Sequence, residues 1–482
     1  MKKTGFFLLF TALMILSAGA QDRPNIVFIL ADDFGYGSLN SYGADKDLLR
    51  TPHIDRIASQ GMSFKDASTP ASICSPTRYG FLMGRYPWRS SLKFGVVSPT
   101  GPLLPDPDRT SIADWLKERG YSTAAIGKWH LGYGSVDPCD YTGILSPGPL
   151  ELGFDYHFGV PQNHDDKTGV YVENDKIYGL KSKKVQPYSR SYYGTRYMGF
   201  DAPQRVNKDV MGDLTDKAVD WMKTRDTEQP FFLYFASIAV HHPITPSDGM
   251  RGVSNCGPYG DFIQDLDQAV GRILETLDYL GVADNTILIF SSDNGGDIPK
   301  NHPEAPETQA EEAGLKINGA LRGDKHTIWE GGTRVPFIVK WPGKIKEGSE
   351  SAGMINLIDI FATLAEILDG EQPDPSVAAP DSYSFLSSLI QSGAKAGRNA
   401  MVTADVDGMQ AIRIGEWKYI DDVYPEGLAE NRLKQLRNFK PQLYNIDLDP
   451  SEQNNLYESN PKVVRKLKAE LDLIRNTEPG RK

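Results

Sequence analysis

Continuous apolar runs of strand length are the feature that most constrains how this chain can fold. Residues 25–30 read Asn-Ile-Val-Phe-Ile-Leu, and a similar run spans residues 231–235. Such runs are typical of strands buried on both faces of a parallel sheet. Elsewhere apolar residues recur at helical spacing, notably Phe262, Leu266 and Val270 in a helix expected to end at Gly281. The alternation predicts an α/β fold with a large, mainly parallel sheet sandwiched by helices.

The same patterns predict further elements in the first three quarters of the chain. We expect strands at residues 122–126, 286–290 and 336–341, and helices at residues 51–58 and 355–368. Thr110 is the expected cap of a helix whose Ile112, Trp115 and Leu116 share one face and which stops at Gly120.

Two stretches interrupt these patterns. Residues 137–208 are rich in Gly, Pro, Tyr and charge, and we expect loops and short strands there rather than core. A Ser/Gly/Lys-rich stretch at residues 391–398 predicts a boundary between a large domain (21–395) and a small C-terminal α+β subdomain (396–482). Within the subdomain we expect strands and one terminal helix, at residues 410–414, 417–420, 442–446 and 461–475.

The first twenty residues have the form of a secretory signal. Lys2 and Lys3 precede an apolar run over residues 6–16, and Ala18 and Ala20 are small residues before a cut at Gln21. We therefore expect an exported protein, periplasmic or secreted. No other stretch approaches the roughly 20 apolar residues of a membrane span. The net charge of −11 argues against a nucleic-acid partner.

Polar residues follow four of the predicted strands. These residues are Asp32 with Asp33, Lys128 with His130, His241, and Asp293 with Asn294. Because ligands gather at the carboxyl ends of parallel strands, the four clusters are expected to form one site. The four Asp and Asn residues offer only oxygen ligands, which suits Ca²⁺ or Mg²⁺ better than zinc. Taken singly, such residues are more often helix caps or turn residues. Lys128 and His130 are two apart on what should be extended chain, so both are expected to point the same way.

The segment Cys74-Ser75-Pro76-Thr77-Arg78 combines a nucleophile, a helix start and a cation. Pro76 suits the first position of a helix and Ser75 its N-cap, which leaves Cys74 just outside the helix, where an anion is favoured. The alternative is a buried structural cysteine. The other two cysteines, Cys139 and Cys256, either form one disulfide or stay free.

This segment, followed by Gly84-Arg85, resembles the Cys-x-Pro-[Ser/Thr/Ala]-Arg signature of the type I sulfatase family, whose cysteine is oxidised to formylglycine (3-oxoalanine). Met83 stands where the family often has Thr. Further segments resemble the family at residues 127–132, 241–243, 291–295, 323–332 and, more weakly, 443–450. In the fourth of these Asp324 and His326 replace glycines, which leaves Lys325 in register.

The resemblance implies an alkaline-phosphatase-like fold and a sulfuric ester hydrolase, with residues 21–395 as its catalytic domain. A hydrated aldehyde at position 74 would attack sulfur, and Ca²⁺ (or Mg²⁺) would be held by residue 74 with Asp32, Asp33, Asp293 and Asn294. Sulfate would be bound by Arg78, Lys128 and Lys325. His241, with Lys325, would assist departure of the alcohol, and His130 would take a proton from the second hydroxyl. The resemblance also implies a maturation enzyme acting on Cys74.

Sulfated carbohydrate is the expected substrate, with a lean toward exo-action on galactose or N-acetylgalactosamine 6-sulfate. Trp88, Arg89 and His164 are candidate sugar contacts, although surface and packing roles are as plausible on sequence grounds. A phosphodiesterase or phosphonate monoester hydrolase on the same fold is the main alternative. A non-catalytic glycan-binding relative is a third, against which the intact Cys74, Arg78 and Lys128 weigh.

Overall fold

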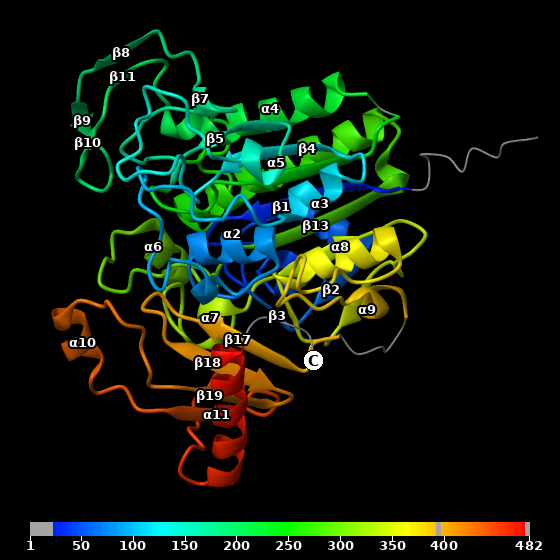
Figure 1. The fold of residues 1–482 in the computed structure, drawn as a ribbon, viewed down its shortest axis with the longest axis vertical. Coiled ribbons are helices and arrows are strands. Elements are labelled where there is room, and N and C mark those ends of the chain that lie inside the picture. Colours follow the sequence, from blue (N-terminus) through cyan, green and yellow to red (C-terminus); the bar gives the residue numbers. More distant parts are fainter. Residues whose placement is uncertain (1–22, 227, 392–396, 478–482) are drawn as a thin grey trace, which may run out of the picture.

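A ten-stranded sheet runs through the larger part of the molecule (Figure 1). The computed structural model describes residues 23–226, 228–391 and 397–477, so the predicted signal and the exact domain boundary lie outside the described residues. The strand order is β15-β2-β14-β13-β1-β12-β4-β5-β6-β7. The five central strands are parallel to one another: β13 (Thr286–Ser292), β1 (Asn25–Ala31), β12 (Phe231–Ala236), β4 (Ser122–Lys128) and β5 (Tyr156–Val160). The predicted mainly parallel sheet is thus confirmed.

Shorter strands flank this parallel block. On one side β14 (Phe337–Lys340) pairs antiparallel with β13 and with β2 (Met62–Phe64), beside β15 (Ser349–Ser351). On the other side lie β6 (Val172–Glu173) and β7 (Lys176–Ile177). A separate pair joins β3 (Ala67–Ser68) to β16 (Ile355–Asn356).

Helices cover both faces of the sheet because alternate side chains of its strands point to opposite sides. Val27 and Ile29 of β1 pack with α1 (Pro52–Ser59), α4 (Val210–Thr224) and α5 (Gly257–Tyr279). Phe28 and Leu30 pack on the other face, with α2 (Cys74–Met83), α3 (Ile112–Lys117) and α8 (Asp359–Asp369). All seven residues of β1 are buried, as its unbroken apolar run predicts. Short helices α6 (Pro306–Glu312), α7 (Glu330–Thr333) and α9 (Leu386–Ile390) complete the large domain.

Three local predictions outside the site are wrong. Helix α3 is capped by Ser111 and not by Thr110, because the Ser111 hydroxyl and Asp114 form a capping box. The helix expected over residues 355–368 begins only at Asp359, after β16. The region 137–208 also contributes β5 to the core sheet; its buried polar residue His157 interrupts the apolar pattern but is paired with Ala125 O at 2.9 Å.

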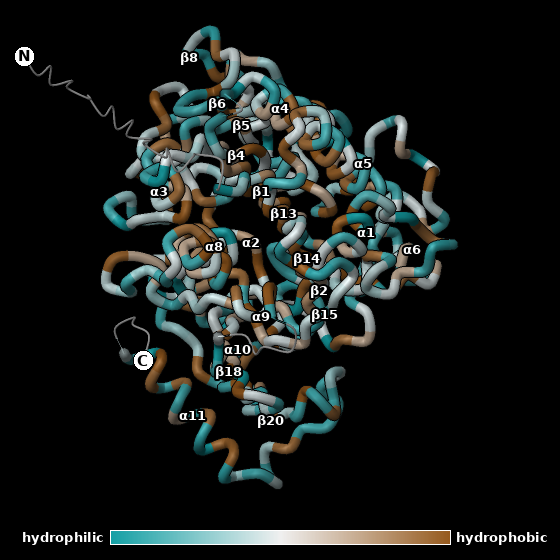
Figure 2. Tube along the Cα trace, turned by 90° about the vertical axis from the view of Figure 1, so that its right-hand side faces the viewer, coloured by the Kyte–Doolittle hydropathy of each residue, from teal (hydrophilic) through white to brown (hydrophobic). Residues whose placement is uncertain are grey.

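The C-terminal subdomain is a four-stranded antiparallel sheet with one long helix. Its strands are β17 (Ala400–Ala404), β18 (Gln410–Ile414), β19 (Trp417–Ile420) and β20 (Gln442–Asn445), with α10 (Glu430–Leu436) between the last two. Helix α11 (Pro461–Asn476) buries Val464, Leu467 and Leu471, and its tube alternates brown and teal in Figure 2 as an amphipathic helix should. Strand β17 and helix α10 are additions to the predicted elements.

A buried ion-pair cluster joins the subdomain to the large domain. Lys418 of β19 donates to Glu330, the first residue of α7, at 2.9 Å and pairs with Glu452 at 3.0 Å. Arg413 of β18 contacts Asp66 at 2.6 Å. No described helix is both long enough and apolar enough to cross a membrane.

Candidate active site

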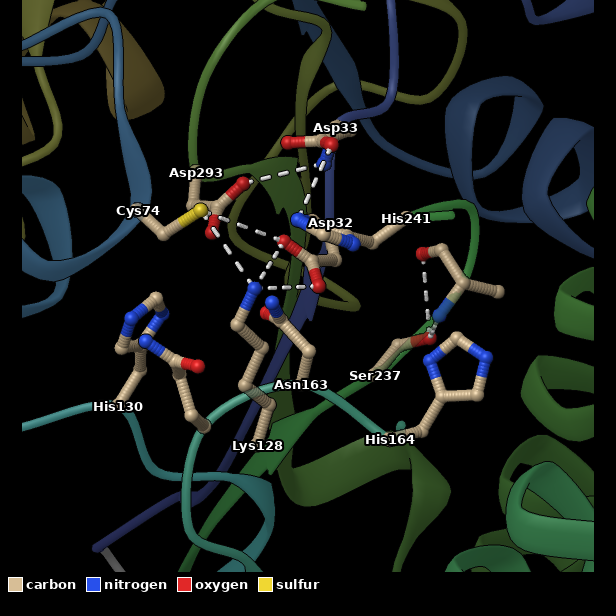
Figure 3. Close-up of polar contacts among 12 residues, drawn as sticks. Asp32, Asp33, Cys74, Lys128, His130, Asn163, His164, Ser237, His241 and Asp293 are labelled. Carbon is tan, nitrogen blue, oxygen red and sulfur yellow. Dashed lines mark hydrogen bonds and ion pairs between the residues drawn. The ribbon is translucent and has the colours of Figure 1, made fainter. Parts of the chain in front are cut away.

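The polar clusters that follow the parallel strands meet at one edge of the sheet, as predicted. Lys128 ends β4, and its ammonium donates to both carboxylate oxygens of Asp32, which follows β1, at 2.6 and 2.8 Å. Asp33 N–H donates to Asp293, which follows β13, at 3.2 Å. His241, beyond β12, lies with its Nε2 3.7 Å from Asp33. Figure 3 shows these side chains converging.

Glycine at position 127 is required for the strand pairing that positions Lys128. Gly127 has φ of 120°, and a Cβ there would lie 1.8 Å from the carbonyl oxygen of Ala236 on β12. Any larger residue would push the two strands apart.

Cys74 is the first residue of α2, so the predicted cap is wrong. Ile73 occupies the N-cap position, and the Ser75 hydroxyl instead donates to His130 O at 2.7 Å and accepts from Val97 N–H. The Cys74 sulfur lies 3.5 Å from Lys128 Nζ and 3.8 Å from Asp32 Oδ1, with 2% of the residue exposed. Burial raises the pKa of its thiol to about 12, more than Lys128 and Lys325 can offset. An unmodified Cys74 is therefore a neutral thiol at physiological pH.

Three buried cations surround this thiol and its carboxylates. Arg78 donates to Asp293 Oδ2 from Nε at 3.0 Å and from Nη2 at 2.7 Å. Lys325 donates to Asp33 at 2.7 Å, so its loop holds the register expected despite His326, whose φ is 75°. Burial alone would raise the pKa of Asp33, but Lys325 and Lys128 hold it below its ordinary value.

The carboxylates crowd closely enough to hold a cation. Ligand atoms of Asp32, Asp33, Cys74 and Asp293 all lie within 4.8 Å of one another. Burial, and after it repulsion from Asp293 and Asp33, raises the pKa of Asp32 to about 7 even though Lys128 opposes the shift. The amide of Asn294 donates to Asp33 at 2.8 Å, while its Oδ1 is buried without a protein partner. An orphaned oxygen beside three carboxylates fits a hard divalent cation.

Two buried histidines lie at this site in neutral form. Both ring nitrogens of His130 are without a hydrogen-bond partner in the described structure, and its φ is 57°. The backbone at His130 is therefore left-handed and not extended, so the prediction of extended chain from Lys128 to His130 is wrong: β4 ends at Lys128. Burial, followed by nearby cations, lowers the pKa of both His130 and His241 well below 6.5. His241 Nδ1 donates to His242 O at 2.6 Å, which leaves Nε2 toward Asp33.

Two further residues at the site were missed. Tyr193 donates to His242 O at 3.0 Å and lies 3.5 Å from His241 Nδ1, and Asn163 Nδ2 donates to the Tyr193 hydroxyl at 3.1 Å. Both come from the aperiodic region 137–208, where no spacing pattern links a residue to a distant strand end.

The three predicted sugar contacts lie in different surroundings. Trp88 stacks on Tyr86 at 4.2 Å and packs against the core of the subdomain. Arg89 pairs with Asp381 at 3.0 Å and donates to the last carbonyls of α11. Through these contacts both residues help to hold α11 in place. None of these contacts is with a residue of the cluster around Cys74. His164 contacts the loop that follows His241, with its Nε2 2.9 Å from Pro243 O. Burial lowers the pKa of His164 to about 3.

The described cysteines are all free and buried, which resolves the choice left open for Cys139 and Cys256.

The fold and the site together define a hydrolase of the alkaline-phosphatase-like class, with a buried residue at a helix start facing carboxylates, cations and histidines. The family model described as Sulfatase matches residues 24–370. N-acetylgalactosamine-6-O-sulfatase of Bacteroides thetaiotaomicron is 36% identical, over 94% of this chain and 94% of the relative. Human arylsulfatase A is 30% identical, over 96% of this chain and 90% of the relative. A solved Bacteroides thetaiotaomicron protein, described with the metabolism of multiple glycosaminoglycans, aligns with a TM-score of 0.85 at 36% identity, covering 95% of this chain and 100% of that one.

This chain belongs to the sulfatase family and is a sulfuric ester hydrolase.

Proposed function

We propose that the protein removes the 6-O-sulfate of N-acetylgalactosamine or a related galactose-type sugar at the end of a glycan, using formylglycine at position 74 and Ca²⁺. The observation that carries the proposal is the buried Cys74, ringed by Lys128, Arg78 and Lys325 beside an oxygen-rich cation site. The substrate rests on the relatives named for N-acetylgalactosamine 6-sulfate.

Oxidation of Cys74 is needed because its own thiol is a poor nucleophile. With a pKa of about 12 the group is protonated at neutral pH. A hydrated aldehyde at position 74 supplies one hydroxyl that attacks sulfur and a second whose deprotonation expels sulfate. This requires a maturation enzyme that acts on Cys74, and we further propose that residues 1–20 direct export of the protein.

The cation would be held by Asp32, Asp33, Asp293 and Asn294 with residue 74, and when bound it supplies Lewis-acid stabilisation of sulfate oxygens. Mg²⁺ has the same ligand preference, but the number of carboxylates favours Ca²⁺.

The cations of the chain bind and orient the sulfate group. Arg78, Lys128 and Lys325 are donors already held in place by carboxylates, so they can balance charge that develops on the sulfate oxygens without reorganising. His241, with Lys325, would give a proton to the sugar oxygen as the sulfur–oxygen bond breaks. The pKa of His241 is low because of burial and Lys325; an anionic sulfate bound alongside raises it toward the range an acid needs.

His130 would act as the base in the second half of the reaction. Its ring is neutral and its nitrogens are unpartnered, so it can accept the proton of the second hydroxyl on residue 74. Sulfate then leaves, the carbonyl of the aldehyde returns, and water restores the hydrate.

Two measurements test the proposal. Peptide mass spectrometry on the tryptic fragment from Asp66 to Arg78, from protein made with a maturation enzyme, should detect an aldehyde at position 74. Sulfate release from N-acetylgalactosamine 6-sulfate should then exceed release from the 4-sulfate. Cys74→Ala should abolish it, whereas Cys256→Ala, at another buried free cysteine, should not. An intact thiol, or faster cleavage of a matched aryl phosphodiester, would refute the proposal.

A further inference from the structure

Residues 181–200 form a twisted hairpin, here called the basic arm, that stands out from the body beyond β7 (Figure 1). Strand β8 (Ser182–Val185) pairs with β11 (Phe200–Asp201), and β9 (Tyr188–Arg190) pairs with β10 (Arg196–Tyr197). The arm carries five cations and no acidic residue, in a chain whose net charge is −11. The charge of the arm is therefore positive, whereas the net charge of the whole protein is negative.

The cations of the arm have no carboxylate partner among the described ion pairs. All five are exposed, and they are Lys181, Lys183, Lys184, Arg190 and Arg196. The neighbouring carboxylates are already engaged: Asp201 accepts from the Ser182 hydroxyl at 2.6 Å, and Asp165 accepts from Tyr192 N–H and the Tyr197 hydroxyl.

Two of these cations occupy opposed positions on paired strands. Arg196 lies directly opposite Arg190 in the β9–β10 pair. Like charges at opposed positions destabilise a strand pair, and neither arginine has a carboxylate partner among the described ion pairs. The pair persists because Tyr188 and Tyr197, the next cross-strand neighbours, stack at 5.0 Å with 15° between their rings. A bound anion would remove the repulsion.

The turn of the arm reaches the active site. Tyr193 contacts His242 O and His241 as described above, while 41% of the residue stays exposed. Its neighbour Tyr192 is 61% exposed, with its ring 5.4 Å from that of His242. The arm therefore carries exposed aromatic side chains at its turn, beside the catalytic histidines, and exposed cations along its strands.

We propose that the basic arm binds anionic groups, sulfate or carboxylate, on the part of the glycan chain beyond the sugar that is desulfated. Arg190 and Arg196 form its paired anion site, because two guanidinium groups can hold one sulfate through charge-assisted hydrogen bonds. The exposed tyrosine rings offer apolar faces to the sugars between the charges. The inference rests on the proposed function for the identity of the chain, and it explains how an acidic enzyme attracts a polyanion through a local field that extends about 10 Å.

Binding of chondroitin 6-sulfate chains tests the inference. The full-length protein would carry Cys74→Ala to prevent turnover, with affinity measured by calorimetry at about 50 and 200 mM salt. Adding Arg190→Gln with Arg196→Gln should weaken binding roughly tenfold at low salt and make its salt dependence shallower. The matched control is Arg465→Gln with Lys466→Gln, which removes two exposed charges from α11 and should leave binding as in the parent. Affinity and salt dependence equal to those of the control would overturn the inference.

Thermal unfolding separates binding from folding. Without glycan, the arm variant should unfold at about the same temperature as its parent, because relief of the like charges at opposed strand positions offsets loss of the exposed hydrogen bond from Arg196 Nη2 to Pro187 O at 2.8 Å. A lower midpoint would assign the two arginines to the fold and refute the proposal. Failure of the proposed function would instead appear as absent sulfate release by the Cys74 protein, in an assay that does not involve the arm variants.

Discussion

Glu330→Gln should weaken the junction between the two parts of the molecule. Glu330 is 2% exposed, and its carboxylate accepts from Arg334 Nε at 2.7 Å and from Lys418 of the subdomain at 2.9 Å. Burial alone would raise the pKa of Glu330, but Arg334 and Lys418 hold it well below its ordinary value of 4.5. The substitution keeps the shape of the side chain and removes the charge.

The expected loss is about 3 kcal/mol in the free energy of unfolding. Removing one partner of a buried ion pair costs about 3–5 kcal/mol, because the other charge is left uncompensated. Here each cation keeps a second carboxylate, Asp66 for Arg334 and Glu452 for Lys418, both at 3.0 Å. The lower end of the range therefore applies.

The loss should also depend on pH. Since the pKa of Glu330 is lower in the folded protein than in the unfolded chain, its stabilisation is present above about pH 4.5 and fades as the pH falls toward the folded value. The difference between wild type and variant should thus shrink in acid.

Urea unfolding of both proteins, near pH 7 and near pH 4, measures these effects. The control is Glu430→Gln, which breaks an exposed pair with Lys434 and should cost less than about 0.5 kcal/mol. A Glu330→Gln midpoint equal to that of the control at neutral pH, or a difference that grows in acid, would refute the reasoning.

Three further substitutions address the site and its support. Asn294→Leu should reduce the affinity for Ca²⁺ at least tenfold, roughly the scale of losing a metal-site group; a calcium dependence of the thermal midpoint like that of wild type would count against Asn294 as a ligand. His241→Ala should lower kcat on N-acetylgalactosamine 6-sulfate by about 10²–10⁴ and lower it much less on a nitrophenyl sulfate, whose leaving group needs no proton. Equal losses on both substrates would contradict the acid role. Arg89→Ala should cost about 1–3 kcal/mol, because it frees Asp381 and the last carbonyls of α11, and an unchanged unfolding midpoint would exclude this anchoring role.

The central strands and their polar ends were predictable because both signals are local. An unbroken apolar run identifies β1, and the residue after each parallel strand falls at the ligand-binding edge whatever the rest of the chain does. Strands β18 and β19 begin and end at the predicted residues.

What could not be predicted depends on distant partners. Ser75 has the character of a cap, but its hydroxyl is engaged by His130 O, 55 positions away. Arg89 was a candidate sugar contact on sequence grounds, but the carbonyl of Thr477, 388 positions later and just after α11, is one of its acceptors. Tyr193 contacts His242 only because the turn of the basic arm lies beside the loop that follows β12. Such contacts depend on tertiary packing, and no spacing pattern in the sequence indicates them.

The burial of Cys74 has a consequence for the order of events in biosynthesis. With 2% of the residue exposed and its sulfur against Lys128, the folded protein offers an oxidising enzyme no access to the thiol. The oxidation proposed for Cys74 must therefore take place while the segment around it is still unfolded. A chain that folds first keeps its thiol and stays inactive. The yield of active protein therefore depends on whether the maturation enzyme oxidises Cys74 faster than the segment around it folds.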